Sequence, residues 1–288
     1  MMIKQAIINT AYSVISKSTS VLYESTNGLF DPVIKEMDGQ LFDSKDILEN
    51  YYYDCYFSNN IFTNNNMKDF IFTNHLKSVI GIHSEPPHSF KKEDLYIFHS
   101  NTKYSTKIFF GDDIAASWRV DNSVNNFIID YGIPRFNSKV PRDVPVLILN
   151  LDNNPQIDNL YRFIQSNIDK CIMIKSISGL SSLQEIVDVI SKSKIVIDTS
   201  SRINILFALA CGCKTISSLK NIQSSFNYPI EDYSSIMPLI NTVLLSNDEN
   251  ISENIKEEIS TNYPYDTFLA KVNSIFTNYI KHQEIFKL

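Results

Sequence analysis

The sequence predicts an α/β protein whose second half forms a doubly wound parallel sheet. Short apolar runs alternate there with segments that have the apolar period of a helix. The runs are almost wholly apolar, which is typical of strands that are buried on both faces of a parallel sheet. The chain has 288 residues, of which 43% are hydrophobic and 20% charged, so it is long enough for two globular domains.

The elements of the second half follow in a regular order. Strands are predicted at residues 146–149, 171–174, 195–197 and 215–216. Apolar residues spaced by three and four predict helices around residues 158–164, 183–190, 203–210 and 236–243. Asp158 is the expected N-cap of the first helix, and Ser182 with Glu185 forms a capping box for the second. This alternation of strands and helices predicts the parallel sheet.

The first half has a weaker pattern. Strands are expected at residues 4–8, 51–57, 79–82, 95–98 and 108–110, and a helix is expected over residues 124–131, with Ser123 as its cap. Polar residues and prolines make 137–145 a predicted linker. We therefore expect one domain at 1–138, a second at 139–262 and a C-terminal helix at 263–288. Pro264 interrupts the helical tail, and one apolar stripe follows it: Phe268, Val272, Ile275, Phe276 and Tyr279.

Composition excludes several classes of protein. No two of the seven glycines lie closer than eleven residues, so neither a Gly-x-Gly-x-x-Gly dinucleotide loop nor a P-loop can form. A net charge of −6 argues against polyanionic partners such as DNA. No apolar run approaches the length of a membrane span and no leader opens the sequence, so we expect a cytoplasmic protein with reduced cysteines. Abundant Asn, Ile and Lys indicate the low-GC coding of many viruses and some bacteria.

The loop after strand 195–197 is the first candidate site. Ligands of open parallel sheets bind at the carboxyl ends of the strands. Thr199, Ser200 and Ser201 precede a helix that carries Arg202 and Asn204 in its first turn. A helix N-terminus with an adjacent arginine binds anions such as phosphate. The alternative is that the serines only cap the helix and Arg202 is a solvated surface residue.

Two further candidates follow strands of the first half. His83 and Glu85 come after strand 79–82, where a histidine can act as a base and a glutamate can orient it. The alternative for His83 is a hydrogen-bonded structural histidine. Asp112 and Asp113 follow strand 108–110 and can act as a base or bind a metal, or they can simply begin a helix. No metal site is predicted, because no third ligand accompanies His83 and His88.

One segment resembles a known family. FALACGCKTIS at 207–217 is similar to the E-A-M-A-C-G-x-P-V-I-A segment of GT-B glycosyltransferases. YGIP at 131–134 resembles the element at the interdomain hinge of that family, and GIHS at 81–84 resembles the strand that ends in a histidine at its cleft. Within the segment, Cys211 and Cys213 are expected to be packing residues, with Gly212 ending a helix.

The resemblance implies two Rossmann-like domains that face each other across a cleft, with helix 263–288 packing back toward the first. It implies a UDP- or GDP-sugar as donor and neither a tightly bound cofactor nor an essential metal. The donor diphosphate would lie on Thr199, Ser200, Ser201, Arg202 and Asn204, with Lys175 as a further contact. The acceptor would meet the candidate catalytic residues, which are His83, Glu85, Asp112 and Asp113.

The sequence also departs from the family. Two glutamates of many retaining members correspond to Thr199 and Phe207, and the phosphate loop after the first strand of the second domain reads LNLD at 149–152. Two alternatives therefore stay open: a catalytically inactive binding or scaffold protein, and a viral glucosyltransferase that acts on modified DNA bases. The acidic charge weakens the second, so a glycan, protein or small-molecule acceptor is favoured over DNA.

Overall fold

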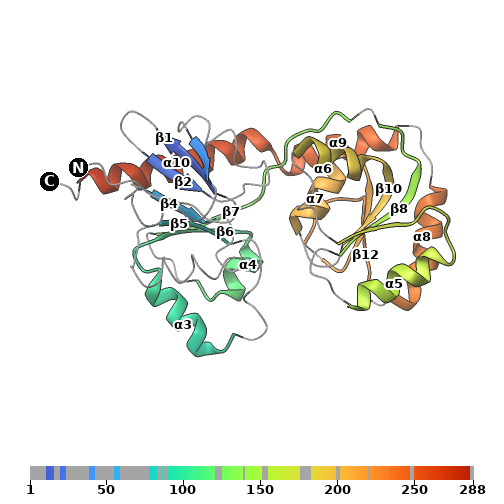
Figure 1. Ribbon diagram of the computed structural model, residues 1–288, viewed down its shortest axis with the longest axis horizontal. Coiled ribbons are helices and arrows are strands. Elements are labelled where there is room, and N and C mark those ends of the chain that lie inside the picture. The colour runs from blue at the N-terminus through green and yellow to red at the C-terminus, as the bar shows by residue number, and fades with distance from the viewer. Residues whose placement is uncertain are drawn as a thin grey trace. The chain divides into compact units, whose positions relative to one another are not determined.

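The structure is a computed structural model in which the chain divides into two units. It describes residues 11–15, 20–23, 39–42, 55–58, 78–82, 86, 90–120, 125–138, 140–150, 155–175, 183–198, 202–219, 221–231, 233–246 and 250–285. Unit 1 is Met1–Tyr131 with Asp266–Leu288, and unit 2 is Gly132–Tyr265 (Figure 1). The expected domain boundaries at 138/139 and 262/263 stay predictions, and so does the expected cleft between the two domains.

Unit 1 contains a seven-stranded sheet in the order β3-β1-β2-β4-β5-β6-β7. Its antiparallel part pairs β1 with β2 and β3, whereas β2, β4, β5, β6 and β7 run parallel. The parallel part confirms the predicted strands at 79–82 and 108–110; the strand expected at 4–8 lies outside the described residues. The strand bounds are Ala11–Ile15, Ser20–Tyr23, Gly39–Phe42, Cys55–Ser58, Ser78–Ile82, Thr106–Phe110 and Asn126–Ile129 for β1 to β7.

Two elements of unit 1 correct the sequence analysis. Residues 126–129 form strand β7, not part of a helix, because they pair with all but the first residue of β6. Ile129 is buried and Ile128 is 45% exposed, which is the two-residue alternation of a strand at a sheet edge. Residues 95–98 belong to helix α3 (Lys92–Asn101), not to a strand. The Asp94 side chain accepts a 2.7 Å hydrogen bond from the Lys91 N–H and so caps that helix.

Helix α10 (Tyr265–Ile285) supplies part of the unit 1 core. All five residues of the stripe predicted after Pro264 are buried. The ring of Phe268 lies 6.2 Å from that of Phe110 on β6, and Phe110 stacks on Tyr131 at 4.9 Å. The end of the chain therefore packs on the sheet of the first half.

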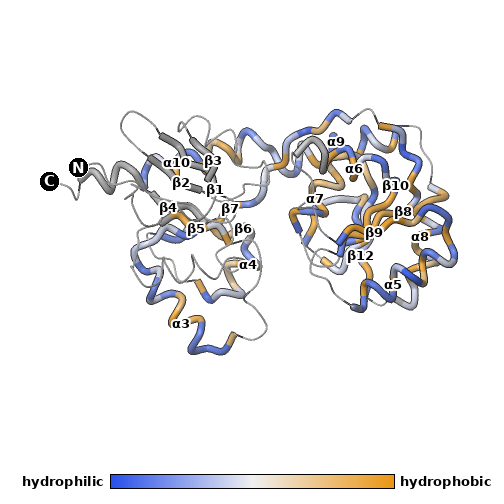
Figure 2. Tube along the Cα trace, in the orientation of Figure 1, coloured by the Kyte–Doolittle hydropathy of each residue, from blue (hydrophilic) through white to orange (hydrophobic). Residues whose placement is uncertain are grey.

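Unit 2 contains a five-stranded parallel sheet in the order β12-β11-β10-β8-β9. All four strands predicted in the second half are present. Figure 2 shows the apolar residues gathered in these central strands. The strand bounds are Val144–Leu149, Ile172–Ile174, Ser193–Ile197, Lys214–Ser217 and Asn227–Pro229 for β8 to β12.

Helices cover both faces of this sheet. One face packs on α5 (Pro155–Gln165) and α8 (Ile236–Leu245), whose apolar residues share one buried cluster with those of β8, β10 and β11. On the other face, α7 (Arg202–Ala210) packs beside α6 (Leu183–Ser191) and α9 (Ile251–Asn262) (Figure 1). The expected α/β class, with two Rossmann-like units, is confirmed, although the first sheet also carries antiparallel strands.

Candidate functional site

The strand order of unit 2 places a switch point between β8 and β10. The chain leaves β8 for α5 on one face of the sheet and leaves β10 for α7 on the other. Just past the two strand ends, the N–H of Asn150 donates to Ile174 of β9 (2.8 Å), whereas the N–H of Asp198 donates to Ile216 of β11 (3.3 Å). Asn150 thus bonds to the strand on one side of the β8–β10 pair, and Asp198 bonds to the strand on the other side. The two segments that follow β8 and β10 therefore separate at this point. Open α/β sheets bind their ligands at such positions.

Asp198 is the buried polar residue at the end of β10, with 1% of its surface exposed. Its Oδ2 accepts a 2.9 Å hydrogen bond from Nδ2 of Asn204 in the first turn of α7. The side-chain amide of Asn204 is thus directed to the carboxylate at the strand end. The bond joins the helix start to the carboxyl end of the sheet.

Arg202 is the first residue of α7 and is half-buried. The first turn of α7 holds no acidic residue, so the positive end of the helix dipole adds to the charge of Arg202. Thr199, Ser200 and Ser201 lie outside the described residues. A helix start with an adjacent arginine attracts anions, and the Asp198 carboxylate already lies beside this turn.

Lys175 lies at the other side of β8, directly after β9. Its Nζ forms a 2.6 Å ion pair with Oδ2 of Asp158 in α5, and Oδ1 of Asp158 accepts a 2.8 Å hydrogen bond from the amide of Asn150. The hydrogen bond from Lys175 is the main reason that the pKa of Asp158 lies below its ordinary value. Asp158 is not the N-cap of α5, as the sequence suggested, because the helix already begins at Pro155.

The remaining sequence-predicted residues lie elsewhere. Asp112 and Asp113 form the first turn of α4 (Asp112–Ser117) in unit 1, after Gly111 with a φ of 115°. This is the helix-start arrangement that the sequence offered as the alternative to a catalytic role. His83 and Glu85 lie outside the described residues. In the part of the chain that the structure describes, no group of three or more His, Cys, Asp or Glu residues could hold a metal ion.

Sequence reasoning missed two buried polar residues at the carboxyl end of this sheet, Asn150 and Asp198. Each directly follows a buried strand, and a polar residue in that place is the signal that could have singled them out. Asn150 belongs to the LNLD segment that replaces the phosphate loop, and Asp198 begins the loop after strand 195–197, so neither is a candidate on the sequence alone. Their importance depends on which strands are neighbours, and this follows from the sheet order.

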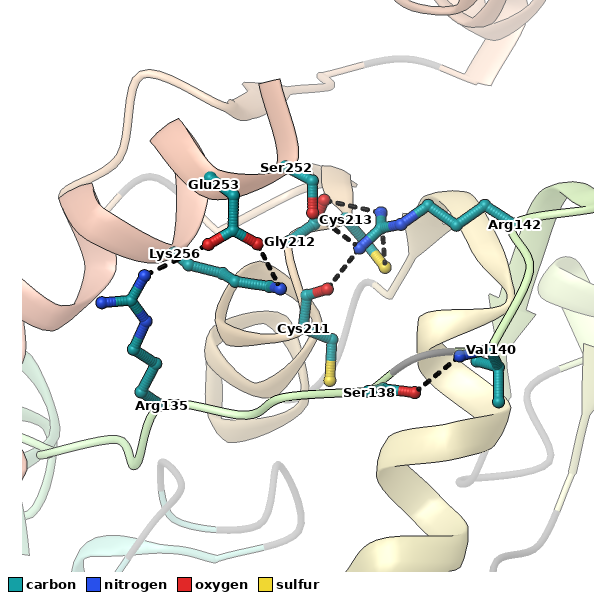
Figure 3. A network of polar contacts seen from close by, with 10 residues as sticks. All are labelled: Arg135, Ser138, Val140, Arg142, Cys211, Gly212, Cys213, Ser252, Glu253 and Lys256. Atoms are coloured by element: carbon teal, nitrogen blue, oxygen red, sulfur yellow. Dashed lines mark hydrogen bonds and ion pairs between the residues drawn. The ribbon is translucent and has the colours of Figure 1, made fainter. Parts of the chain in front are cut away.

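The far end of α7 is fixed by Arg142 (Figure 3). The helix closes as a Schellman motif, because the N–H of Gly212 donates to Leu209 and that of Cys213 to Ala208. Nη1 of Arg142 donates to the carbonyl of Gly212 (2.7 Å), and Nη2 donates to the carbonyl of Cys211 and to Oγ of Ser252 in α9 (3.0 Å). These contacts join α7, α9 and the segment that leads into β8.

The cysteines at this end are packing residues, as predicted. Cys211 and Cys213 are buried, and burial raises the pKa of their thiols to about 12 and about 11. Gly212 has a φ of +77°, so the predicted glycine at the helix end is confirmed. The thiols are therefore protonated and unreactive at neutral pH.

Comparison with known proteins identifies the fold. No family model matches the chain, and no curated protein matches it in sequence. Among solved structures, HepE of Anabaena in complex with UDP-glucose matches with a TM-score of 0.58 at 12% identity, over 87% of this chain and 89% of HepE. Sucrose-phosphate synthase from Thermosynechococcus elongatus matches with a TM-score of 0.57 at 11% identity, over 81% of this chain and 75% of that one.

A third match is a variant of S. aureus TarM in complex with UDP, with a TM-score of 0.54 at 12% identity, over 78% of this chain and 55% of TarM. Within the described ranges, no helix of this chain is both long and apolar enough to cross a membrane. Identities this low establish similarity of fold. The strand orders of the two units and these matches together show that the chain is a divergent example of the GT-B fold.

Proposed function

We propose that this chain binds a nucleotide sugar at the carboxyl end of the five-stranded sheet and transfers the sugar to an acceptor. One observation carries the proposal. Arg202 begins α7 beside the switch point between β8 and β10, in a fold whose solved neighbour HepE holds UDP-glucose. The donor would be a UDP- or GDP-sugar, and no tightly bound cofactor takes part.

The diphosphate would lie at the start of α7. Sugar transfer leaves negative charge on the departing nucleotide, and a preformed cation with helix N–H groups stabilises that charge. Arg202 supplies the cation and can bind two phosphate oxygens at once. Thr199, Ser200 and Ser201 would add hydroxyl and N–H donors. Arg202 therefore has the chief role at the leaving group.

Lys175 would be the second cation. Neighbouring strands are spaced by about 4.8 Å, so the ends of β9 and β10 lie about 10 Å apart on either side of β8. The ion pair with Asp158 holds the Lys175 ammonium at the carboxyl end of the sheet, and the Lys175 side chain is 46% exposed. An extended nucleotide diphosphate can reach both sides of β8.

The residues that we propose for the acceptor belong to unit 1. We assign the acceptor base to His83 or Glu85, which follow strand β5, because an imidazole or a carboxylate can take the proton of an attacking hydroxyl. Asp112 and Asp113 follow β6, which pairs with β5, and they are the alternative carboxylates. A glycan, a protein or a small molecule is the acceptor class that we favour.

A second candidate function is binding without transfer. Phe207 stands where the family resemblance places a glutamate, is only 5% exposed and packs on the ring of Phe136 at 5.8 Å. An apolar core residue at that position favours a GT-B-like protein that binds the nucleotide sugar but does not transfer the sugar.

One pair of assays separates these functions. The first measures melting temperature with UDP, GDP and UDP-glucose; a ligand at 100 times its dissociation constant should stabilise the protein by about 2.7 kcal/mol. The second measures release of free nucleotide from the UDP-sugar or GDP-sugar whose nucleotide binds, with a panel of acceptors. Binding with release supports transfer, and binding without release on every acceptor supports the second candidate. The absence of any shift with all three ligands contradicts both.

A further inference from the structure

Helix α7 is held firmly by its apolar residues and at its C-terminus. Residues 205–210 are all buried, and Arg142 binds the carbonyls of Cys211 and Gly212 at the helix end. Arg202, however, is at the opposite end, where the helix emerges beside the switch point. The direction of its side chain therefore depends on how the first turn is fixed.

The hydrogen bond between Asn204 and Asp198 fixes that turn. Asp198 is attached to the sheet through its N–H, which donates to Ile216 of β11, and its carboxylate holds the Asn204 amide at 2.9 Å. Asn204 is two residues from Arg202 in the same turn. The start of α7 is thus tied to the ends of two neighbouring strands, β10 and β11.

The burial of Asp198 argues for a role in positioning. With 1% of its surface exposed, Asp198 does not face a ligand in this conformation. A buried carboxylate is also a poor source of stability, because desolvation offsets much of what its partners contribute. Its position beside the helix start is what distinguishes it, since a carboxylate there is favoured by the helix dipole and orients neighbouring donors.

We propose that Asp198 and Asn204 are positioning residues that hold the first turn of α7 so that Arg202 receives the donor diphosphate. The inference rests on the proposed function. It reassigns Asn204 from a direct phosphate contact to a residue that acts through Arg202. Loss of the Asn204 amide should therefore affect ligand binding only while Arg202 is present.

The test is a double-mutant cycle in which calorimetry measures UDP affinity. Asn204→Ala should raise the dissociation constant about fivefold, as expected for loss of one hydrogen bond. In an Arg202→Ala background, Asn204→Ala should change it less than twofold. The matched control is Ser138→Ala, which removes a 3.1 Å hydrogen bond to another aspartate of unit 2, Asp188, and should leave the affinity unchanged.

Three outcomes overturn the inference. Equal affinity of Asn204→Ala and wild type removes the positioning role, and a further fivefold loss in the Arg202→Ala background shows direct contact with the ligand. An equally large loss of UDP affinity in Ser138→Ala would show that Asn204→Ala weakens binding through a general loss of stability. If the wild-type chain binds no nucleotide at all, the proposed function fails first, and that result is distinguishable from the other three.

Discussion

Nη1 of Arg142 lies 2.7 Å from the carbonyl oxygen of Gly212, seventy residues further along the chain. The same guanidinium reaches Cys211 and Ser252, so one side chain closes the end of α7 and fastens it to α9. Carbonyls at a helix end need donors, and a cation there is also favoured by the helix dipole. This contact makes Arg142 a central polar support of unit 2.

Arg142→Ala should destabilise unit 2 by roughly 1.5–3 kcal/mol, because it leaves partly buried carbonyls without a charged donor. Urea denaturation measures the loss. Arg135→Ala is the control, since it removes an exposed ion pair with Glu253 and should cost about 0–1 kcal/mol. Equal losses in the two variants would show that the Arg142 contacts contribute no more than a surface pair.

Gly212→Ala should also destabilise the chain, by at least about 1–2 kcal/mol, because a φ of +77° strains residues with a Cβ. The added Cβ would lie 2.2 Å from Oγ of Ser252 and 2.8 Å from its carbonyl oxygen. Adding Ser252→Ala removes only the first of these contacts, so the double variant should recover part of the loss. Thermal denaturation of the three proteins is the measurement, and a wild-type melting temperature for Gly212→Ala would contradict it.

Asp158 should titrate below its ordinary value of 3.8, chiefly because Lys175 hydrogen-bonds to its charged form. The pKa is lower in the folded protein, so the pair stabilises the fold above the unfolded-state pKa. That contribution disappears as the pH falls through the folded-state pKa. Carboxyl NMR titration should show that Lys175→Met raises the Asp158 pKa. Arg162→Met, which removes the charge with the smallest effect on this carboxyl, should raise the pKa less. Equal shifts would contradict the dominant role of Lys175.

The predictable parts of the fold were those that local pattern determines. Strands β8, β10 and β11 are buried on both faces, so their apolar runs identify them directly. Residues 126–129 were misassigned because Phe127, Ile128 and Tyr131 fit a helical spacing, and only pairing with β6 makes them a strand. Local spacing carries no information on that pairing.

The candidate site was predictable to the same extent. Arg202 was found because a charged residue at the start of a helix that follows a buried strand is visible in the sequence. Lys175 came only from the family resemblance, since it follows β9, a strand whose Ile172 is 43% exposed. The Asp198–Asn204 bond and the Arg142 contacts were missed, since they join residues whose proximity depends on the order of the strands and the packing of α7. Long-range neighbours of this kind come only from the folded chain.

The proposed donor site depends most on Arg202 at the start of α7. Calorimetry with UDP on wild type and Arg202→Ala tests it directly, with melting temperatures measured in parallel. Loss of a hydrogen bond to a charged group should raise the dissociation constant about ten- to a hundredfold, and Arg202→Lys should recover only part of the affinity because the two-pronged contact is lost. The control Lys192→Ala, at the amino end of β10, should bind UDP as wild type does. Unchanged UDP affinity in a folded Arg202→Ala protein would contradict the central claim.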